Sequence, residues 1–597
     1  MPGYLRDRFT EMLKGMLIVN GEGFGVPWLR CDFKTAETIR DIYRYWITDE
    51  FRHRFDVTHA QNHLIHRDNP EICEVQFPDM GLKDEWEQAC VSRLVYPPLK
   101  IIKDHEPALL NLIKSNKEKA RGVREIAFQK YAKKHWRTNV TLLQEREWYL
   151  EYGRQWAFSE DPLNLIRDLL IGNPSNYRTP EGRIHMIDLA LEFFNACAEA
   201  LVEDIVVEFK IDDVYHQLDC IRYGITESRD GLPTKYNAIF LSNIPDYTGD
   251  HLSMVLHALP LLKPTSSPES FVQSNILANP ANFTTGLKGT LAEYLLLPNM
   301  AYATNTLGLT MLGPSSSTQA MMNLPPFLIL TEPHQWGISV PKTLIFKPGF
   351  TRWLTQMFFK LALPVPRDLD AEHNNLYRMH QPQTLHQFVR LCIYLVEERN
   401  IPKHWVVNLL EAILTGKVST SATPPIQTPV PFEALKPTPS KTWYMDMFVP
   451  ELQMLLAYYQ PVLPFHILTT LTPLRKYEIS FPKIWMDVTR IPPIINVLAL
   501  MFVNPEVEAI EMEQVFEDFI AYRGEHMQGL MVLMSTFEWH QRGKNFVATW
   551  LMESDSVEEM KIRDWKVGVM RTDSWVPIGQ PGEEGMLVDV KRAVELE

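Results

Sequence analysis

Residues 236–247 read YNAIFLSNIPDY, and this stretch decides the fold. Residues 236–241 are mostly apolar and are followed by a polar turn, a pattern that favours a short buried strand. The turn carries Asn243, Asp246 and Tyr247. Because ligands of open α/β sheets bind outside the carboxyl ends of the strands, we expect these three side chains to face a ligand.

Strand-like and helix-like segments alternate around this turn, which is typical of a parallel α/β sheet. We predict further strands at 165–171, 183–189, 205–211 and 270–277, with helices at 190–204, 214–224 and 250–262. Gly172 follows the first of these strands, Asp188 ends the second, and Asp212 and Asp213 follow the third. Carboxylates at such strand ends suit a ribose diol and an adenine amine. They also suit a helix N-cap, and both interpretations stay open.

This order resembles the class I S-adenosylmethionine-dependent methyltransferase fold over residues 161–280. Asp188, the Asp212-Asp213 pair and the NIPDY turn match the second-, third- and fourth-strand motifs of that family. The resemblance implies S-adenosylmethionine as cofactor, held by Gly172, Asp188, Asp212 and Asp213. It implies that Asn243, Asp246 and Tyr247 orient an acceptor, which is a small molecule or a protein.

This sequence departs from that family at its first motif, which is a glycine-rich turn that opens a helix. Only residues 172–182 separate the first two predicted strands, whereas a parallel crossover needs roughly a dozen residues or more. Either the cofactor cradle is lost or the first strand lies elsewhere.

Three longer stretches carry a second resemblance: YNAIFLSNIPDYTGD, WGISVPKTLIFKPGFTRWLTQMFFKLALPVPRD and IPKHWVVNLLEAILTGKVSTSATPP. They are similar to fungal proteins of largely unassigned function that contain a degenerate methyltransferase-like domain. That group is often associated with a MYND zinc finger and is distantly similar to axonemal dynein assembly factors. The resemblance covers residues 150–460. The six cysteines show no MYND spacing, so it does not extend to zinc binding.

Composition narrows the class of protein. The 597 residues are 45% hydrophobic and 22% charged, which fits a multidomain globular chain. The net charge of −14 argues against a polycation that wraps nucleic acid. Pro is frequent, with 43 residues, and Gly is scarce, with 27, so glycine-rich phosphate loops are disfavoured. No apolar stretch approaches the roughly 20 residues of a membrane span. Scattered cysteines favour a reducing compartment, and we expect a cytoplasmic protein.

The expected architecture is an α/β protein with a Rossmann-like core. We predict a helical region at 1–150, the methyltransferase-type core at 151–290 and a helical continuation at 291–417. A Pro/Ser/Thr linker at 418–442 leads to an α+β region at 443–597, whose strands alternate apolar and polar residues and are expected to be antiparallel.

Two other features allow alternative interpretations. A basic segment at 114–137 includes Tyr131 and Trp136 and is either a solvated helix face or a docking surface for an acidic partner or RNA. His59, His63 and His66 share one helical face and could chelate zinc. No carboxylate motif accompanies them, so we expect a polar helix face and no metal.

Three hypotheses for function follow. The first is a transferase with a strand-edge site, using S-adenosylmethionine or another donor. The second is a catalytically silent interaction or assembly protein that kept the sheet and lost the cofactor loop. The third is a Rossmann-like enzyme that takes aminoacyl groups from tRNA, as cyclodipeptide synthases do, supported only by the basic segment.

Overall fold

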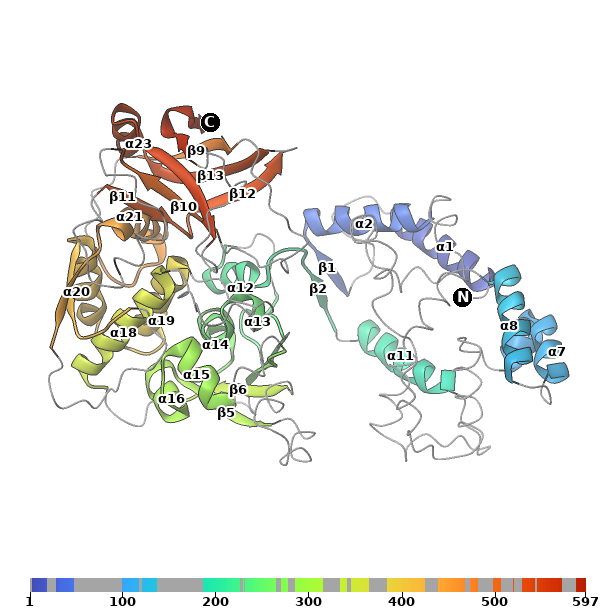
Figure 1. Ribbon diagram of the computed structural model, residues 1–597. Coiled ribbons are helices and arrows are strands. Elements are labelled where there is room, and N and C mark those ends of the chain that lie inside the picture. The colour runs from blue at the N-terminus through green and yellow to red at the C-terminus, as the bar shows by residue number, and fades with distance from the viewer. Residues whose placement is uncertain are drawn as a thin grey trace. The chain divides into compact units, whose positions relative to one another are not determined.

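The computed structural model in Figure 1 describes a mixed α/β chain. The described residues are 3–18, 28–47, 99–116, 121–136, 186–203, 205–225, 229, 231–264, 270–277, 285–314, 333–340, 345–363, 384–424, 439–467, 473–481, 498–505, 519, 529–542, 545–571 and 587–596. The chain divides into two compact units, Met1–Asp212 and Asp213–Glu597, called here the first and the second unit.

The first unit is mostly helical. Its helices are α1 (Gly3–Ile18), α2 (Phe33–Ile47), α6 (Leu99–His105), α7 (Pro107–Asn116), α8 (Arg121–His135) and α11 (Met186–Glu203). Its strands β1 (Leu29–Cys31) and β2 (Val207–Phe209) form a parallel pair. The backbone N–H of Ile211 donates to the Thr35 hydroxyl at 3.0 Å, and Lys210 pairs with Asp32 at 3.2 Å. These contacts fix β2 beside α2.

One strand prediction in this unit is wrong where the structure describes it, and another is confirmed in part. Residues 186–189 of the predicted strand 183–189 are helical, because α11 begins at Met186 and places Asp188 in its first turn. Helix α11 is rich in Ala, Leu and Glu, and the short apolar run at its start belongs to this helix rather than to a buried strand. The predicted strand 205–211 forms only as β2, and it pairs with β1 rather than with the strand at 236–241. Gly172 and the predicted strand 165–171 lie outside the described residues.

The basic segment forms two helices, α7 and α8, with a small core between them. Trp136 is 3% exposed and its Nε1 donates to the Glu106 carboxylate at 3.1 Å. Tyr131 stacks on His135 with ring centroids 4.5 Å apart. Of the two interpretations of this segment, base stacking by Trp136 is not supported, because its ring belongs to the core. His59, His63 and His66 lie outside the described residues.

A mixed four-stranded sheet begins the second unit. The strand order is β3-β4-β6-β5, with β3 (Ala238–Ser242) parallel to β4 (Phe271–Ser274) and with β5 (Leu309–Pro314) and β6 (His334–Ile338) antiparallel. The predicted strands 236–241 and 270–277 are present as β3 and β4. The predicted helix 214–224 is present as α12 (Val214–Tyr223), which ends at Gly224 in the left-handed conformation. Strands β5 and β6 fall in the region for which only helices were predicted.

The segment after β3 changes helix type twice, from α to π to 3-10. It runs through α13 (Pro245–Thr248), α14 (Asp250–Ser253), the π-helix η4 (Met254–Ala258) and the 3-10 turn η5 (Leu259–Leu261). Pro260 has no N–H to donate to the carbonyl of Leu256, so the α-helical ladder ends there. That carbonyl accepts instead from the Arg222 guanidinium at 3.4 Å.

A layer of helices covers this sheet and holds the largest core. The helices are α15 (Leu287–Leu295), α16 (Met300–Leu307), α18 (Lys347–Ala362), α19 (Leu385–Glu397), α20 (Lys403–Leu414) and α21 (Val449–Tyr458). Helices α18 and α19 pack side by side, with Phe358 edge-on to Phe388 (Figure 1). The buried polar tips of Trp353 and Tyr394 donate to the carbonyls of Leu295 and Leu307, which end α15 and α16.

The predicted linker 418–442 is partly structured. Its ends form the antiparallel ribbon of β7 (Lys417–Thr420) and β8 (Lys441–Tyr444), in which Val418 and Trp443 are buried. These ends pair because their β-branched and aromatic residues alternate inward, although the segment as a whole is rich in Pro, Ser and Thr. Residues 425–438 lie outside the described part of the chain.

The predicted antiparallel region forms two four-stranded sheets. One has the order β11-β10-β14-β15, from Leu530–Leu533, Leu498–Val503, Lys566–Arg571 and Val588–Asp589. The other has the order β12-β13-β9-β16, from Phe537–Arg542, Asn545–Glu553, Leu474–Phe481 and Val594–Leu596. All their pairings are antiparallel, as predicted. Between β13 and β14 lies the helix α23 (Ser554–Ile562), where Val557 and Met560 are buried one turn apart.

No helix among the described residues is long and apolar enough to cross a membrane.

Gly249 provides a test of how tightly the sheet and the helices join. Its φ is +113°, and a Cβ there would clash with the Gln387 amide of α19 and the Ser253 hydroxyl. Left-handed backbone costs a non-glycine residue about 1–2 kcal/mol, and overpacking adds about 1–3 kcal/mol. We expect Gly249→Ala to lower the free energy of unfolding by about 3 kcal/mol in urea denaturation. Gly224→Ala is the control, because Gly224 has a φ of +65° but open space around it. An equal loss in both variants would contradict the predicted clash.

Candidate functional site

The polar turn after β3 joins the ends of the two parallel strands. Asp246 is 2% exposed, and its Oδ2 accepts from the backbone N–H of Leu277 at 2.6 Å. Leu277 lies just beyond β4, so this carboxylate closes the sheet edge that was predicted to bind a ligand. Asn243 is half-buried in the same turn, and its carbonyl accepts from the N–H of Asp246 at 3.1 Å. The side chain of Tyr247 lies outside the described part of the structure.

The residue before Asn243 has an unusual backbone. Ser242 is exposed and has a φ of +51°, which L-residues rarely adopt. A register shift between Phe240 and Ser242 accompanies this conformation at the carboxyl end of β3. The backbone therefore leaves the strand sharply at the predicted turn.

Asp213 has a structural role at the start of α12. Its side chain accepts from the backbone N–H of His216 at 2.8 Å, which is an N-cap. Asp212, one residue earlier, is exposed. Of the two interpretations open for this pair, the structure places Asp213 in the capping role.

The predicted site residues are only partly brought together. Asn243 and Asp246 share one turn, whereas Asp188 belongs to α11 of the first unit and Asp213 caps α12. S-adenosylmethionine binding on the expected pattern needs free carboxylates at the ends of adjacent strands. The described residues do not fit that group, because Asp188 lies within α11 and because Asp213 and Asp246 already accept backbone N–H bonds.

A polar row across the sheet was not predicted from the sequence. Ser242, Ser274 and His334 occupy paired positions on β3, β4 and β6. Trp336 Nε1 donates to the Ser274 hydroxyl at 3.2 Å, and the His251 ring lies edge-on to Trp336 at 4.8 Å. Ser274, His334 and His251 are each less than a tenth exposed, so these three side chains are packed between sheet and helix, whereas Ser242 is exposed. Pairing of distant strands brings these residues together, and no local motif indicates it.

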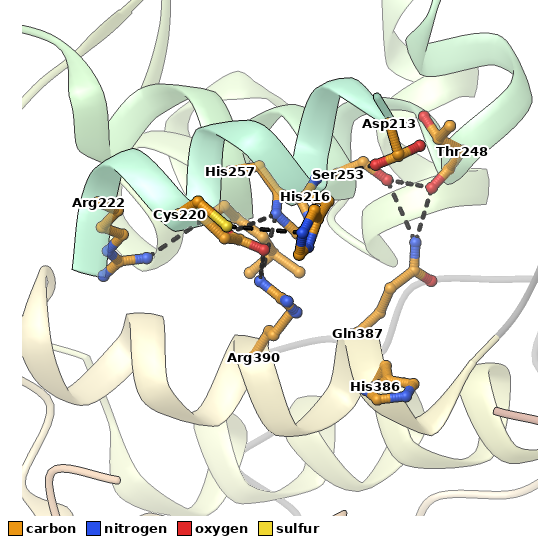
Figure 2. Close-up of polar contacts among 12 residues, drawn as sticks. Asp213, His216, Cys220, Arg222, Thr248, Ser253, His257, His386, Gln387 and Arg390 are labelled. Atoms are coloured by element: carbon orange, nitrogen blue, oxygen red, sulfur yellow. Dashed lines mark hydrogen bonds and ion pairs between the residues drawn. The ribbon is translucent and has the colours of Figure 1, made fainter. Parts of the chain in front are cut away.

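A second set of polar residues lies between α12, η4 and α19 (Figure 2). The Asp219 carboxylate of α12 accepts from His257 Nδ1 at 2.9 Å and forms an ion pair with Arg390 of α19. Arg390 Nε donates to the Tyr459 hydroxyl at 2.7 Å, and that hydroxyl lies 3.1 Å from His386 Nδ1. Five side chains from four segments thus form one connected network.

The protonation states in this network follow from its geometry. Burial alone would raise the pKa of Asp219, but His257 and Arg390 outweigh burial and hold that pKa below its ordinary value. Burial lowers the pKa of His257 despite the nearby carboxylate, so the ring is neutral and its Nδ1–H faces Asp219. Burial lowers the pKa of His386 to about 4, so its unprotonated Nδ1 can accept from the Tyr459 hydroxyl.

A histidine oriented by a buried carboxylate has the geometry of a general base. Here the His257 ring packs on Tyr215 with centroids 4.6 Å apart and is 7% exposed. The Cys220 sulfur lies 3.6 Å from His216 Nε2 on the same helix. The contacts of His257 with Asp219 and Tyr215 hold the ring in the packing between α12 and η4.

The network continues to the turn between β11 and β12. His386 hydrogen-bonds the backbone of Ser535, and the Ser535 hydroxyl accepts from the N–H of Leu385 at 2.7 Å. Glu451 Oε1 accepts from the N–H groups of Met534, Ser535 and Thr536 at 2.9, 2.5 and 3.0 Å. Burial raises the pKa of Glu451 to about 7 against these donors.

Comparisons with known proteins add no family: no family model, curated protein or solved structure matches the chain. Within the described ranges, no group of three or more His, Cys, Asp or Glu side chains could hold a metal ion.

Arg390 provides a test of the network. Arg390→Met leaves the Asp219 carboxylate buried without its cation, and breaking a buried pair costs about 3–5 kcal/mol. We expect that loss in urea denaturation, and a smaller loss in the double variant with Asp219→Asn, because both charges are then removed. Arg475→Met is the control, since Arg475 and its partner Glu595 are both exposed and such pairs contribute at most about 1 kcal/mol. Strictly additive losses would count against a coupled pair.

Glu451 gives a test by pH. Its folded-state pKa of about 7 exceeds the ordinary 4.5, so between these values the folded chain binds more protons than the unfolded chain. Stability from this group is present below pH 4.5 and is lost as the pH rises through 7, by about 3 kcal/mol in total. Glu451→Gln keeps an acceptor oxygen but does not titrate. We expect its unfolding free energy, relative to the parent chain, to rise by that amount from pH 4.5 to 8. A pH-independent difference would refute the raised pKa.

Proposed function

We propose that this chain is a catalytically silent interaction or assembly protein. The observation that carries the proposal is the use of two of the predicted site carboxylates by the fold itself: the exposed Asp213 caps α12, and the buried Asp246 accepts from the N–H of Leu277. A carboxylate that is satisfied by backbone N–H groups can bind a ribose or an acceptor only if the fold gives up that hydrogen bond.

The proposal includes a Rossmann-like core that is reduced in its number of parallel strands. Strands β3 and β4 are parallel neighbours joined through α13, α14 and η4, which is one strand–helix–strand unit. We propose that this unit is what remains of a methyltransferase-type sheet. The resemblance of residues 150–460 to degenerate methyltransferase-like proteins, distantly similar to assembly factors, supports the same view.

The two enzyme hypotheses have weaker support. The left-handed Ser242 at a strand end is the observation that still favours a transferase, because strained backbone clusters at functional sites. The tRNA-dependent hypothesis depended on aromatic stacking beside the lysines of 114–137, and Trp136 is buried there. Its exposed lysines remain a candidate surface for an acidic partner or RNA.

Isothermal calorimetry with S-adenosylmethionine tests the proposal. We expect no saturable heat at millimolar ligand, because the carboxylates are used by the fold. We also expect Asp246→Ala to lower the unfolding free energy by about 1–3 kcal/mol, the usual contribution of a charged hydrogen bond, and Asp246→Asn to lower it less. Asp212→Ala, at an exposed position, is the control for stability. Saturable binding that Asp246→Ala abolishes without unfolding the chain would favour the transferase instead.

A further inference from the structure

The second unit contains a cavity of about 270 Å³ bounded by α21, β11, β13 and α23. Four methionines from these four elements line it: Met454, Met531, Met552 and Met560. Each is 7% exposed or less, so the methionines form the inner wall. Trp565, half-buried before β14, completes the apolar lining.

The polar part of the lining is acidic. Asp446, Glu553 and Glu559 line the cavity, and none of its lining residues is Lys or Arg. Asp446 and Glu559 are exposed, and Glu553 is half-buried. Glu559 pairs with Arg563 at 2.9 Å one turn along α23, an exposed pair that a competing cation can replace at small cost.

Size and chemistry together define the ligand class. Small-molecule pockets are typically about 300–1,000 Å³, so this cavity suits one or two side chains better than a cofactor. Methionine side chains are flexible and polarisable, and they adapt to different apolar groups and to aromatic rings. The carboxylates disfavour nucleotides, phosphates and RNA and attract Lys or Arg.

We propose that this cavity is a docking site for a basic amphipathic segment of a partner protein. An aromatic or large aliphatic side chain of that segment inserts between the methionines, and flanking Lys or Arg side chains lie against Asp446 and Glu559. Such a buried anchor surrounded by a polar rim is the usual arrangement of a protein-binding hot spot. The inference rests on the proposed function, because it names the chemistry of the partner.

The test uses the full chain and a fluorescein-labelled helical peptide of twelve residues, with one Trp, two Leu and five Lys on adjoining faces. Fluorescence anisotropy should give saturable binding that weakens as salt is raised, since rim charges are screened. Replacing the peptide's Trp by Ala should weaken binding at least tenfold. Replacing its Lys residues by Glu should abolish binding.

Two variants of the chain locate the site. Asp446→Asn with Glu559→Gln should weaken the peptide about five- to tenfold, whereas Glu538→Gln, an exposed acid on β12, should leave affinity unchanged. Ser556→Phe projects a ring from the half-buried lining of α23 and should also weaken binding. If each variant has the same thermal unfolding midpoint as the parent chain, its fold is retained.

Methyl NMR of the chain labelled at its methionines provides an independent readout. The signals of Met454, Met531, Met552 and Met560 should shift on peptide addition, while Met12 and Met311, which are exposed elsewhere, should not. Three results would overturn the proposal. They are shifts confined to other methionines, equal peptide affinity of the parent chain and the Asp446→Asn/Glu559→Gln variant, and no binding at millimolar peptide. Heat from S-adenosylmethionine would overturn the proposed function alone, whereas failure of the peptide without such heat overturns only this inference.

Discussion

The buried pair of Asp219 and Arg390 is the interaction on which the second unit depends. Removing both charges from water is costly, and the cost is offset only if the attraction between them and the added hydrogen bonds are well formed. His257 and Tyr459 supply those bonds, so η4 and the end of α21 are fixed together with α12 and α19. The segments α12 and η4, which flank β3, are therefore held to helix α19 by a buried ion pair and hydrogen bonds as well as by apolar packing.

Local signals explain which elements could be predicted. Helix α12 begins at a capping Asp213 and ends at Gly224, and α20 follows Pro402, so their limits are written in adjacent residues. The pairing of β2 with β1 joins residues far apart in the chain, and no local pattern indicates it. The same holds for the Asp219–His257–Arg390 network. The prediction of a strand at 183–189 was wrong at residues 186–189, which begin α11, because a short apolar run does not distinguish a strand from a helix.

The role of the predicted site residues was ambiguous for a physical reason. A carboxylate at a strand end accepts hydrogen bonds equally well from a ligand and from backbone N–H groups. Asp246 accepts from a backbone N–H group, that of Leu277. Three of the few glycines also serve the packing of polar groups rather than the binding of a ligand. Gly249, Gly308 and Gly416 all have positive φ, and a polar side chain from elsewhere in the fold occupies the space of the missing Cβ: Gln387, Arg399 and Asp446 respectively. Glycine here permits close polar contacts with the backbone, not a phosphate loop.

Helix α21 connects the polar network to the methionine-lined cavity. Glu451 on this helix accepts three backbone N–H groups from the β11–β12 turn, and Tyr459, just beyond it, accepts from Arg390. Met454 and Gln453 of the same helix line the cavity. Because the hydrogen bonds at both ends fix the helix, the cavity wall is held by contacts that the docked segment does not have to make. A preformed wall lowers the ordering cost of binding, so flexible methionines can adapt to the ligand while the backbone that carries them stays in place.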